Sequence, residues 1–176
     1  MTAPMTAPMT APMTASNTAA DTDTAAPLHI ATLASLQTRL GEHLATSPWV
    51  TIDQRRIDLF AEATGDYQWI HLDAVRAAAG PFGSTIAHGF LTLSLLPELA
   101  NLAMVIDDVK MGVNYGLNRV RFTAPVPSGS RLRGQFKLKA YEVIEGGAQV
   151  TMEVSIEREG STKPVCVAEA VSRRFT

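Results

Sequence analysis

An acid and an imidazole lie five residues apart in the stretch GDYQWIHLD, residues 65–73, with an amide and an indole between them. Asp66 and His71 are residue types that move protons near neutral pH, because histidine titrates there and desolvation raises a carboxyl pKa toward that range. The pair predicts acid–base catalysis around a water molecule, which contributes roughly 10²–10⁴-fold to a rate. A structural pair at a helix end is the alternative, and the spacing alone does not separate the two.

Gly89 belongs to a second cluster, TIAHGFLTLS at residues 85–94. It lies near the start of a predicted helix, where backbone N–H groups lack partners and the helix dipole favours negative charge. A glycine also lets a ligand approach the backbone closely, so the position suits an oxyanion hole for a carbonyl oxygen. Close packing of the helix against a sheet explains the glycine equally well. His88 is predicted to be a structural histidine rather than a third polar group of the site.

Composition argues against several classes of partner. The net charge of −2 and the pI of about 6.1 do not indicate a nucleic-acid-binding surface, because such a surface would need a basic patch. The basic clusters RLRGQFKLK and SRRF are predicted to be solvated strand faces, with contact to a phosphorylated ligand as a weaker alternative. Cys166 is the one cysteine, which excludes an intrachain disulfide, and it is predicted to be a small buried hydrophobe.

Other catalytic motifs are absent from the sequence. No G-x-S-x-G surrounds Ser84 or Ser94, and no phosphate loop or dinucleotide fingerprint occurs. A metal site drawn from His71, Asp73 and His88 is disfavoured, because Asp73 is predicted to cap a helix and no H-E-x-x-H spacing occurs. We therefore predict neither a metal nor a separate cofactor.

Residues 1–28 are predicted to be a disordered tail, and residues 29–176 a single domain. The tail contains three successive MTAP repeats and few large apolar side chains, so little offsets the entropy of ordering it. The first basic residue is Arg39, which argues against a signal peptide, and no membrane-spanning stretch is evident. These features predict a cytoplasmic protein without membrane insertion.

The first part of the domain has helical periodicity. A helix is predicted from about 30 to 45 on the spacing of four leucines, Leu33, Leu36, Leu40 and Leu44. SPWVTI is read as extended, and Thr51 with Gln54 resembles a capping box for a second helix that ends at Gly65. Asp66 then lies on a loop, and Asp73 is predicted to be the N-cap of AVRAAA.

The second part of the domain predicts a sheet around a helix. STIAHGFLTLSLLPEL, residues 84–99, is apolar nearly all round, so we expect a helix buried on every side. Four strand-like segments follow, within residues 116–122, 131–144, 148–159 and 163–175. Helices followed by antiparallel strands give an α+β fold.

Two motifs carry a resemblance to a known family. TGDYQWIHLDAVRAA followed by GPFGSTIAHGFLTLSLL resembles the MaoC-like dehydratases, which include (R)-specific enoyl-CoA hydratases and the nodulation-protein-N-like group. NYGLNRVRFTAPVPSGSRLRG also resembles the strand and turn that follow in that family. The resemblance runs from about residue 33 to the end of the chain, and two separated motifs at the right distance make it specific.

The resemblance implies a hotdog fold, an antiparallel sheet around one long helix, as a homodimer. It implies hydration of trans-2-enoyl-CoA to (R)-3-hydroxyacyl-CoA, with Asp66 and His71 matching the catalytic acid–base pair and the Gly89 N–H holding the thioester oxygen. Coenzyme A would be part of the substrate. Gln68 and Trp69 replace the usual Asn-Pro, so Gln68 keeps a substrate-binding amide while the shape of the pocket changes. The alternatives are a non-catalytic module that binds acyl thioesters or proteins, and an acyl-CoA thioesterase.

Overall fold

The computed structural model describes residues 26–176. Most of the tail predicted to be disordered therefore lies outside the described residues. Leu28, which we placed in that tail, already belongs to a strand, β1 (Leu28–Ile30).

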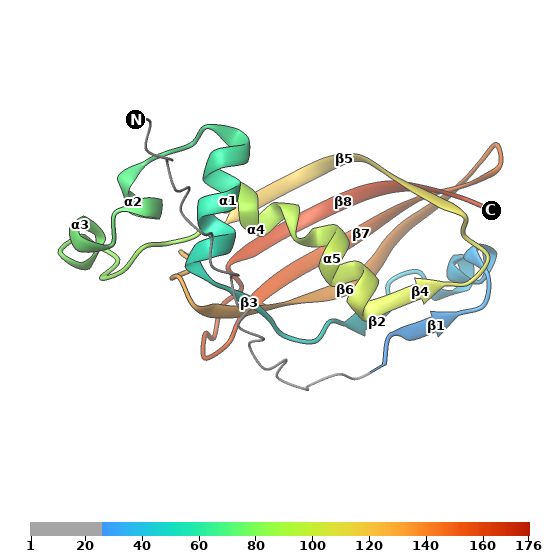
Figure 1. Ribbon diagram of the computed structural model, residues 1–176. Helices are drawn as coiled ribbons and strands as arrows, with labels where there is room; N and C mark the ends of the chain where they lie inside the picture. Colours follow the sequence, from blue (N-terminus) through green and yellow to red (C-terminus); the bar gives the residue numbers. More distant parts are fainter. Residues whose placement is uncertain (1–25) are drawn as a thin grey trace, which may run out of the picture.

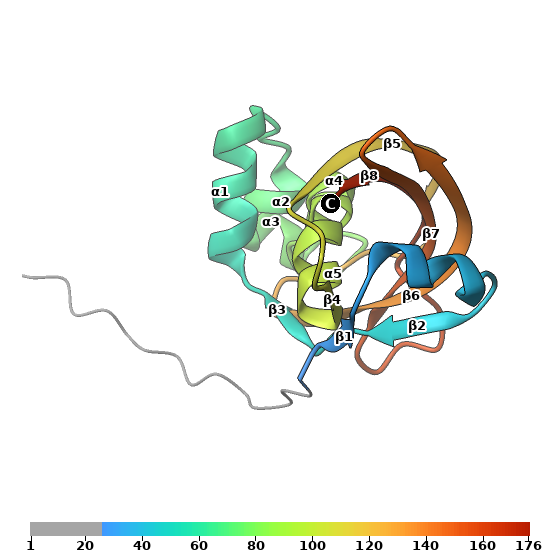
Figure 2. The same cartoon turned by 90° about the vertical axis from the view of Figure 1, so that its right-hand side faces the viewer.

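The core of the fold is one antiparallel sheet that curls around a helix (Figures 1 and 2). The strand order is β2-β6-β7-β8-β5, and β3 also pairs with β6. This is the hotdog architecture that the sequence led us to expect, and the four predicted strand segments are confirmed. The strands are β2 (His43–Thr46), β3 (Val50–Ile52), β5 (Met111–Phe122), β6 (Ser130–Ile144), β7 (Gly147–Arg158) and β8 (Cys166–Phe175).

The concave face of the sheet is apolar. On β7, Val150, Val154 and Ile156 are buried and Met152 packs against the same core, as their alternation with polar residues predicts. Cys166 on β8 is fully buried, and burial raises the pKa of its thiol to about 11. That environment confirms the prediction of a small buried hydrophobe.

The central helix is formed by two segments, α4 (Gly89–Ser94) and α5 (Leu96–Ala103). Leu91, Leu95 and Leu99 recur at steps of four and are buried against the sheet. The expectation that this helix is buried on every side is wrong for its outer face, because the Phe90 side chain is 68% exposed. A curled sheet covers only the face of the helix that it touches, so the outer face lies open in a single chain.

The predicted helix from about 30 to 45 is also wrong. The chain forms a short 3₁₀ helix, η1 (Leu33–Arg39), between β1 and β2. Gly41, with φ of 83°, redirects the backbone in a left-handed conformation that favours glycine. The leucines that suggested one apolar stripe therefore lie in different elements. Leu36 is a buried residue of η1, and Leu44 is a buried residue of β2.

The second helix, α1 (Gln54–Thr64), ends as predicted but begins with a different cap. The Asp53 side chain accepts a hydrogen bond from Arg56 N at 2.9 Å, whereas Thr51 lies in β3, so the predicted capping box is wrong. Gly65 closes the helix with φ of 75°. Asp66 follows directly, on a loop, as we expected.

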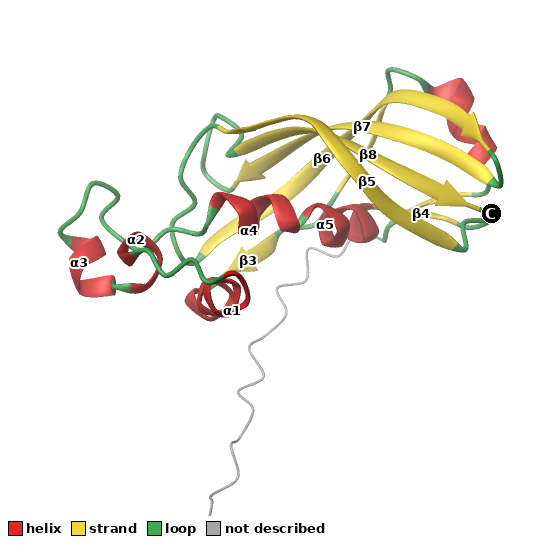
Figure 3. Cartoon of the chain, turned by 90° about the horizontal axis from the view of Figure 1, so that it is seen from above, coloured by secondary structure: helices red, strands yellow, loops and turns green. Residues whose placement is uncertain are grey.

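Two short helices complete one end of the molecule, α2 (Trp69–Leu72) and α3 (Ala74–Ala78). The Asp73 side chain accepts a hydrogen bond from Arg76 N at 2.9 Å, which confirms its role as the N-cap of α3. Figure 3 shows α1, α2 and α3 gathered beside the start of α4. This arrangement brings the two motifs of the sequence to the same end of the fold.

At the opposite end, β4 (Met104–Ile106) continues from α5 and pairs in parallel with β1.

Within residues 26–176, no helix has the length and apolar character required to cross a membrane. Cytoplasmic localisation stays a prediction.

Candidate active site

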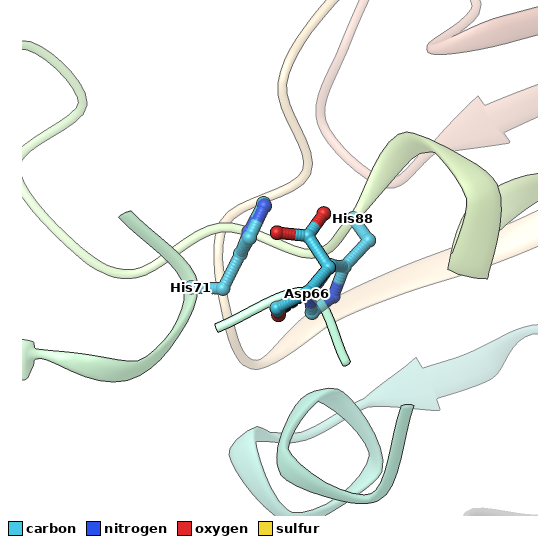
Figure 4. A group of neighbouring side chains, drawn as sticks. All are labelled: Asp66, His71 and His88. Carbon is cyan, nitrogen blue, oxygen red and sulfur yellow. Dashed lines mark hydrogen bonds between the residues drawn. The ribbon is translucent and has the colours of Figure 1, made fainter. Parts of the chain in front are cut away.

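Three side chains from separate segments meet at the end of the fold that carries α1, α2 and α3. Asp66 comes from the loop after α1, His71 from α2, and His88 from the residue before α4. One potential ligand atom from each residue lies within 4.8 Å of the others. Figure 4 shows the Asp66 carboxylate projecting toward the His71 ring. The structure thus brings together the predicted acid and imidazole.

The hydrogen bond of His71 to the backbone determines which ring nitrogen carries its proton. His71 Nδ1 lies 2.7 Å from the carbonyl oxygen of Ile86, an acceptor, so Nδ1 carries the proton and donates it. The acceptor is held in place on both sides, since Ile86 N donates to Ile70 O and Ala87 N donates to Val126 O. In neutral His71, Nε2 therefore keeps its lone pair and can accept a proton.

The surroundings of His71 favour its neutral form. Burial lowers the pKa of His71 below its ordinary value, and the neighbouring His88 lowers it further. The hydrogen bond to Ile86 and the charge of Asp66 raise the pKa of His71 and oppose part of that effect. The side chain is only 5% exposed. At neutral pH this imidazole is suited to the role of a general base.

Gln54, which was predicted only to cap a helix, supports His71. Gln54 Nε2 donates to the carbonyl oxygen of His71 at 2.8 Å, and Gln54 Oε1 accepts from Thr85 Oγ1 at 2.6 Å. The amide therefore joins α1, α2 and the segment that leads to α4. No signal in a single sequence distinguishes this glutamine from a solvent-facing one.

His88 contacts both members of the predicted pair. Its Nε2 lies 3.0 Å from the backbone carbonyl oxygen of Asp66 and donates to it. Its ring stacks on His71, with centroids 3.7 Å apart, and packs against Phe60 on α1 at 5.0 Å. His88 is 2% exposed, and its Nδ1 is buried without a hydrogen-bond partner among the described residues. The prediction of a structural histidine is therefore incomplete, because this residue touches the whole site.

Gly89 lies on the wall of a pocket of about 440 Å³ that also includes His71, Thr92 and Phe122. No hydrogen bond recorded for the described residues uses the Gly89 N–H. A Cβ atom at this position would lie 2.9 Å from a ring carbon of Phe122. The structure therefore shows the close packing expected at Gly89, whereas a ligand-binding role for its amide stays a prediction.

Gln68 does not take part in the pocket in this structure. Its side chain is exposed at the start of α2, and it is absent from the residues that line the 440 Å³ pocket. Its backbone carbonyl oxygen accepts a hydrogen bond from His71 N at 3.0 Å. A substrate-binding role for the Gln68 amide stays a prediction.

The cluster of Asp66, His71 and His88 is poorly arranged for one metal ion. A metal bound to an imidazole lies close to the plane of that ring along the nitrogen lone pair. The rings of His71 and His88 are stacked, with planes only 26° apart, so their lone pairs do not converge on one point. One ring would have to turn before both nitrogens could bind the same ion.

Comparison with known proteins shows the family to which this chain belongs. A family model described as MaoC like domain matches residues 35–160. The chain belongs to the MaoC-like family. It is 53% identical over 143 residues to 3-hydroxyacyl-thioester dehydratase Z of Mycobacterium tuberculosis, covering 81% of this chain and 95% of that protein. It is 47% identical over 148 residues to nodulation protein N of Rhizobium leguminosarum bv. viciae, covering 82% and 92% of the two chains.

Two solved structures of hydratases have the same architecture. The R-hydratase PhaJ1 from Pseudomonas aeruginosa matches with a TM-score of 0.63 at 28% identity, covering 77% of this chain and 81% of that chain. The (R)-hydratase from A. caviae matches with a TM-score of 0.60 at 23% identity, covering 74% and 95% of the two chains. The second likeness concerns the fold alone.

Proposed function

We propose that this MaoC-like protein is a hydro-lyase that interconverts trans-2-enoyl-CoA and (R)-3-hydroxyacyl-CoA. The observation that carries the proposal is the His71 imidazole, which has an unprotonated Nε2 beside the Asp66 carboxylate. Similarity to a 3-hydroxyacyl-thioester dehydratase and to an R-hydratase supports the reaction class. Coenzyme A as the thiol and the R configuration of the product are part of the proposal.

In the hydration direction, Asp66 and His71 hold one water molecule. His71 Nε2 takes a proton from this water as its oxygen bonds to C3 of the enoyl group. The electrons of the C2=C3 double bond move toward the thioester oxygen, and the resulting enolate then takes the proton from His71 at C2. The Asp66 carboxylate orients the water and stabilises the imidazolium that forms between the two steps. Dehydration is the reverse, and neither direction uses a metal or redox cofactor.

In this proposal the Gly89 N–H stabilises the enolate. It lies on the same pocket wall as His71, at the start of α4. A backbone donor at the developing oxyanion contributes roughly 10²–10³-fold to a rate. Because Gly89 has no side chain, the thioester can approach the amide closely.

The test is the hydration of crotonyl-CoA, which is measured as the loss of the enoyl absorbance. We expect Asp66→Asn and His71→Gln each to fold and to lose at least ~100-fold in kcat. Asp107→Asn is the matched control, because Asp107 is exposed at the opposite end of the fold and bonds His29. Near wild-type turnover by folded Asp66→Asn would refute the assignment. Release of free thiol instead of hydration would indicate a thioesterase, and binding without turnover a non-catalytic module.

We also propose that the enzyme is a homodimer. β5 is an edge strand of twelve residues that pairs with β8 alone in the described sheet. Long edge strands with unpaired backbone groups are normally covered. A second copy of the chain is the simplest cover, and it would also lie over the open outer face of α4.

A further inference from the structure

A separate cavity lies at the far end of the fold from Asp66 and His71. It has a volume of about 230 Å³ and lies between α5, β4 and the concave face of the sheet. Figure 1 shows β4 running from α5 toward the end of the sheet that lies away from α2 and α3. The walls are mainly apolar, and include Ala100, Met104, Val109, Phe136, Val150 and Met152.

Among residues 26–176, Arg174 is the one ionisable residue on the wall of this cavity. The SRRF segment was predicted to be a solvated strand face, and that prediction holds only in part for Arg174, which is half-buried and whose pKa is lowered by desolvation. A guanidinium keeps its charge under such conditions. Its Nε donates a hydrogen bond to Ser172 Oγ at 3.3 Å, and no carboxylate within residues 26–176 forms an ion pair with it. A half-buried, partly desolvated cation without an anion is costly, so its partner is expected from outside the chain.

The neighbouring Arg173 is satisfied within the protein. Its guanidinium lies 3.7 Å from the centre of the Tyr115 ring, and its Nε donates to Gln149. The contrast between two adjacent arginines on β8 shows that the situation of Arg174 is not a general property of the strand.

The backbone of β5 leaves room for the Arg174 guanidinium. Gly112 pairs with Arg174 across the two strands. A Cβ atom on Gly112 would lie 3.0 Å from Arg174 Nη1, closer than the guanidinium could remain without shifting. The absence of a side chain at this position therefore fits the placement of the cation.

One face of the central helix leads from the candidate active site to this cavity. Gly89, Leu93, Leu96 and Ala100 follow one another at steps of four, three and four, which places them on one side of a helix. Gly89 borders the catalytic pocket, and Ala100 borders the Arg174 cavity. Between them, Leu93 and Leu96 line a further hollow of about 460 Å³ beside β5. Eleven residues of helix rise about 16 Å, a span that an extended chain of roughly a dozen carbons covers.

We propose that the cavity beside Arg174 binds the carboxylate end of a long aliphatic chain. The apolar walls suit methylene groups, and the planar guanidinium matches a carboxylate in a paired geometry. The carboxylate has two sources. It is either a free fatty acid or the far end of a dicarboxylic enoyl-CoA whose thioester lies at Gly89, and this second source rests on the proposed function.

Binding of free acid is tested by calorimetry with decanoate and 1-decanol, which share a chain and differ in charge. We expect wild-type protein to bind decanoate at least ~10-fold more tightly than 1-decanol, the gain of a charge-assisted pair. Arg174→Met should abolish this preference, and Arg174→Lys should keep part of it. Arg173→Met is the matched control and should bind like wild type. Thermal denaturation establishes that each variant is folded, and the comparison of the two ligands on wild type needs no variant.

The second source, a dicarboxylic substrate, is tested by comparing kcat/KM for 2-dodecenedioyl-CoA with kcat/KM for 2-dodecenoyl-CoA. If the carboxylate belongs to the substrate, Arg174→Met lowers kcat/KM for the dicarboxylic chain at least ~10-fold and that for the monocarboxylic chain less than ~2-fold. Decanoate preference without this effect assigns the cavity to a free fatty acid. The proposal is overturned if decanoate and 1-decanol bind wild type equally and Arg174→Met leaves both substrates unchanged. Crotonyl-CoA hydration is assayed with wild type and with Arg174→Met. This assay distinguishes a failure of the proposed catalysis from a failure of the proposed carboxylate site.

Discussion

The imidazole of His88 lies against that of His71, with ring centroids 3.7 Å apart and ring planes 26° apart. The same residue donates to the backbone of Asp66 and directly precedes Gly89. Three groups of the proposed mechanism are thus connected through one buried residue, two by its side chain and Gly89 by the backbone. A ring at this position keeps the acid, the base and the start of α4 in a fixed relation, so His88 is best described as a positioning residue.

Replacing His88 by phenylalanine separates its two contacts. Phe keeps a ring between His71 and Phe60 but removes the hydrogen bond to Asp66 O, which contributes about 1 kcal/mol. We expect kcat for crotonyl-CoA to fall roughly fivefold or more. The pKa of His71, followed by NMR, should rise, because the lowering effect of His88 is gone.

Asp73→Ala serves as the control for the His88 variant. It removes the cap of α3, close to His71 in the chain, and should cost about 1 kcal/mol of stability. The titration of His71 should not move in this variant. If His88→Phe also leaves both kcat and the titration of His71 unchanged, the positioning role is wrong.

The pH dependence follows from the lowered pKa of His71. The proposed base must be neutral, so the acid limb of kcat/KM should lie below the ordinary histidine value of about 6.5. The unfolded chain binds the proton more readily than the folded one. Neutral His71 therefore contributes stability above pH ~6.5, and this stability falls as the pH drops toward the folded-state pKa. An acid limb above pH 7 would contradict the assignment of His71 as the base.

Asp66 has the opposite electrostatic effect on His71, which gives a second check. Its charge raises the pKa of His71, so Asp66→Asn should lower that pKa further. The measurement is an NMR titration of the imidazole in wild type and in the variant, which needs no residual activity. An unchanged pKa would mean that the carboxylate does not act on this ring.

The sequence predicted the strands and the loop position of Asp66 because both depend on local patterns. Val150, Val154 and Ile156 alternate with polar residues, and the loop position of Asp66 follows from the helix stop at Gly65. The leucines near the start of the domain misled the prediction, since Leu36 and Leu44 are buried by different elements. Burial was decided there by packing rather than by periodicity.

The polar residues that support the site could not be found in the same way. Gln54 and His88 act through contacts with residues 17 and 22 positions away in the chain, His71 and Asp66 respectively. Arg174 was expected to be solvated because its segment is basic, yet it lines a cavity. Each of these features depends on long-range packing, which composition and spacing do not encode for one chain.

Gly89→Ala tests whether the glycine serves packing or ligand approach. The added Cβ would lie 2.9 Å from the Phe122 ring, so the ring must shift in the pocket. We expect a loss of roughly 10²-fold in kcat/KM. Phe122→Leu in the same chain relieves the contact, and Phe122→Leu alone gives the reference. A double variant that stays at least ~10-fold below this reference supports ligand approach to the amide, whereas full recovery would assign Gly89 to packing.

The edge strand β5 provides the test of the homodimer. Alternate residues of this strand are exposed and apolar, namely Met111, Val113, Tyr115 and Leu117. A strand of this kind is usually covered, because its free backbone groups and apolar side chains would otherwise pair with other chains. We expect wild-type protein to scatter light as a dimer at micromolar concentration and Leu117→Lys to shift the mass toward the monomer. Leu40→Lys is the control, since Leu40 is equally exposed but follows η1, outside the sheet. A monomeric mass for wild type would show that a second copy of the chain does not cover β5.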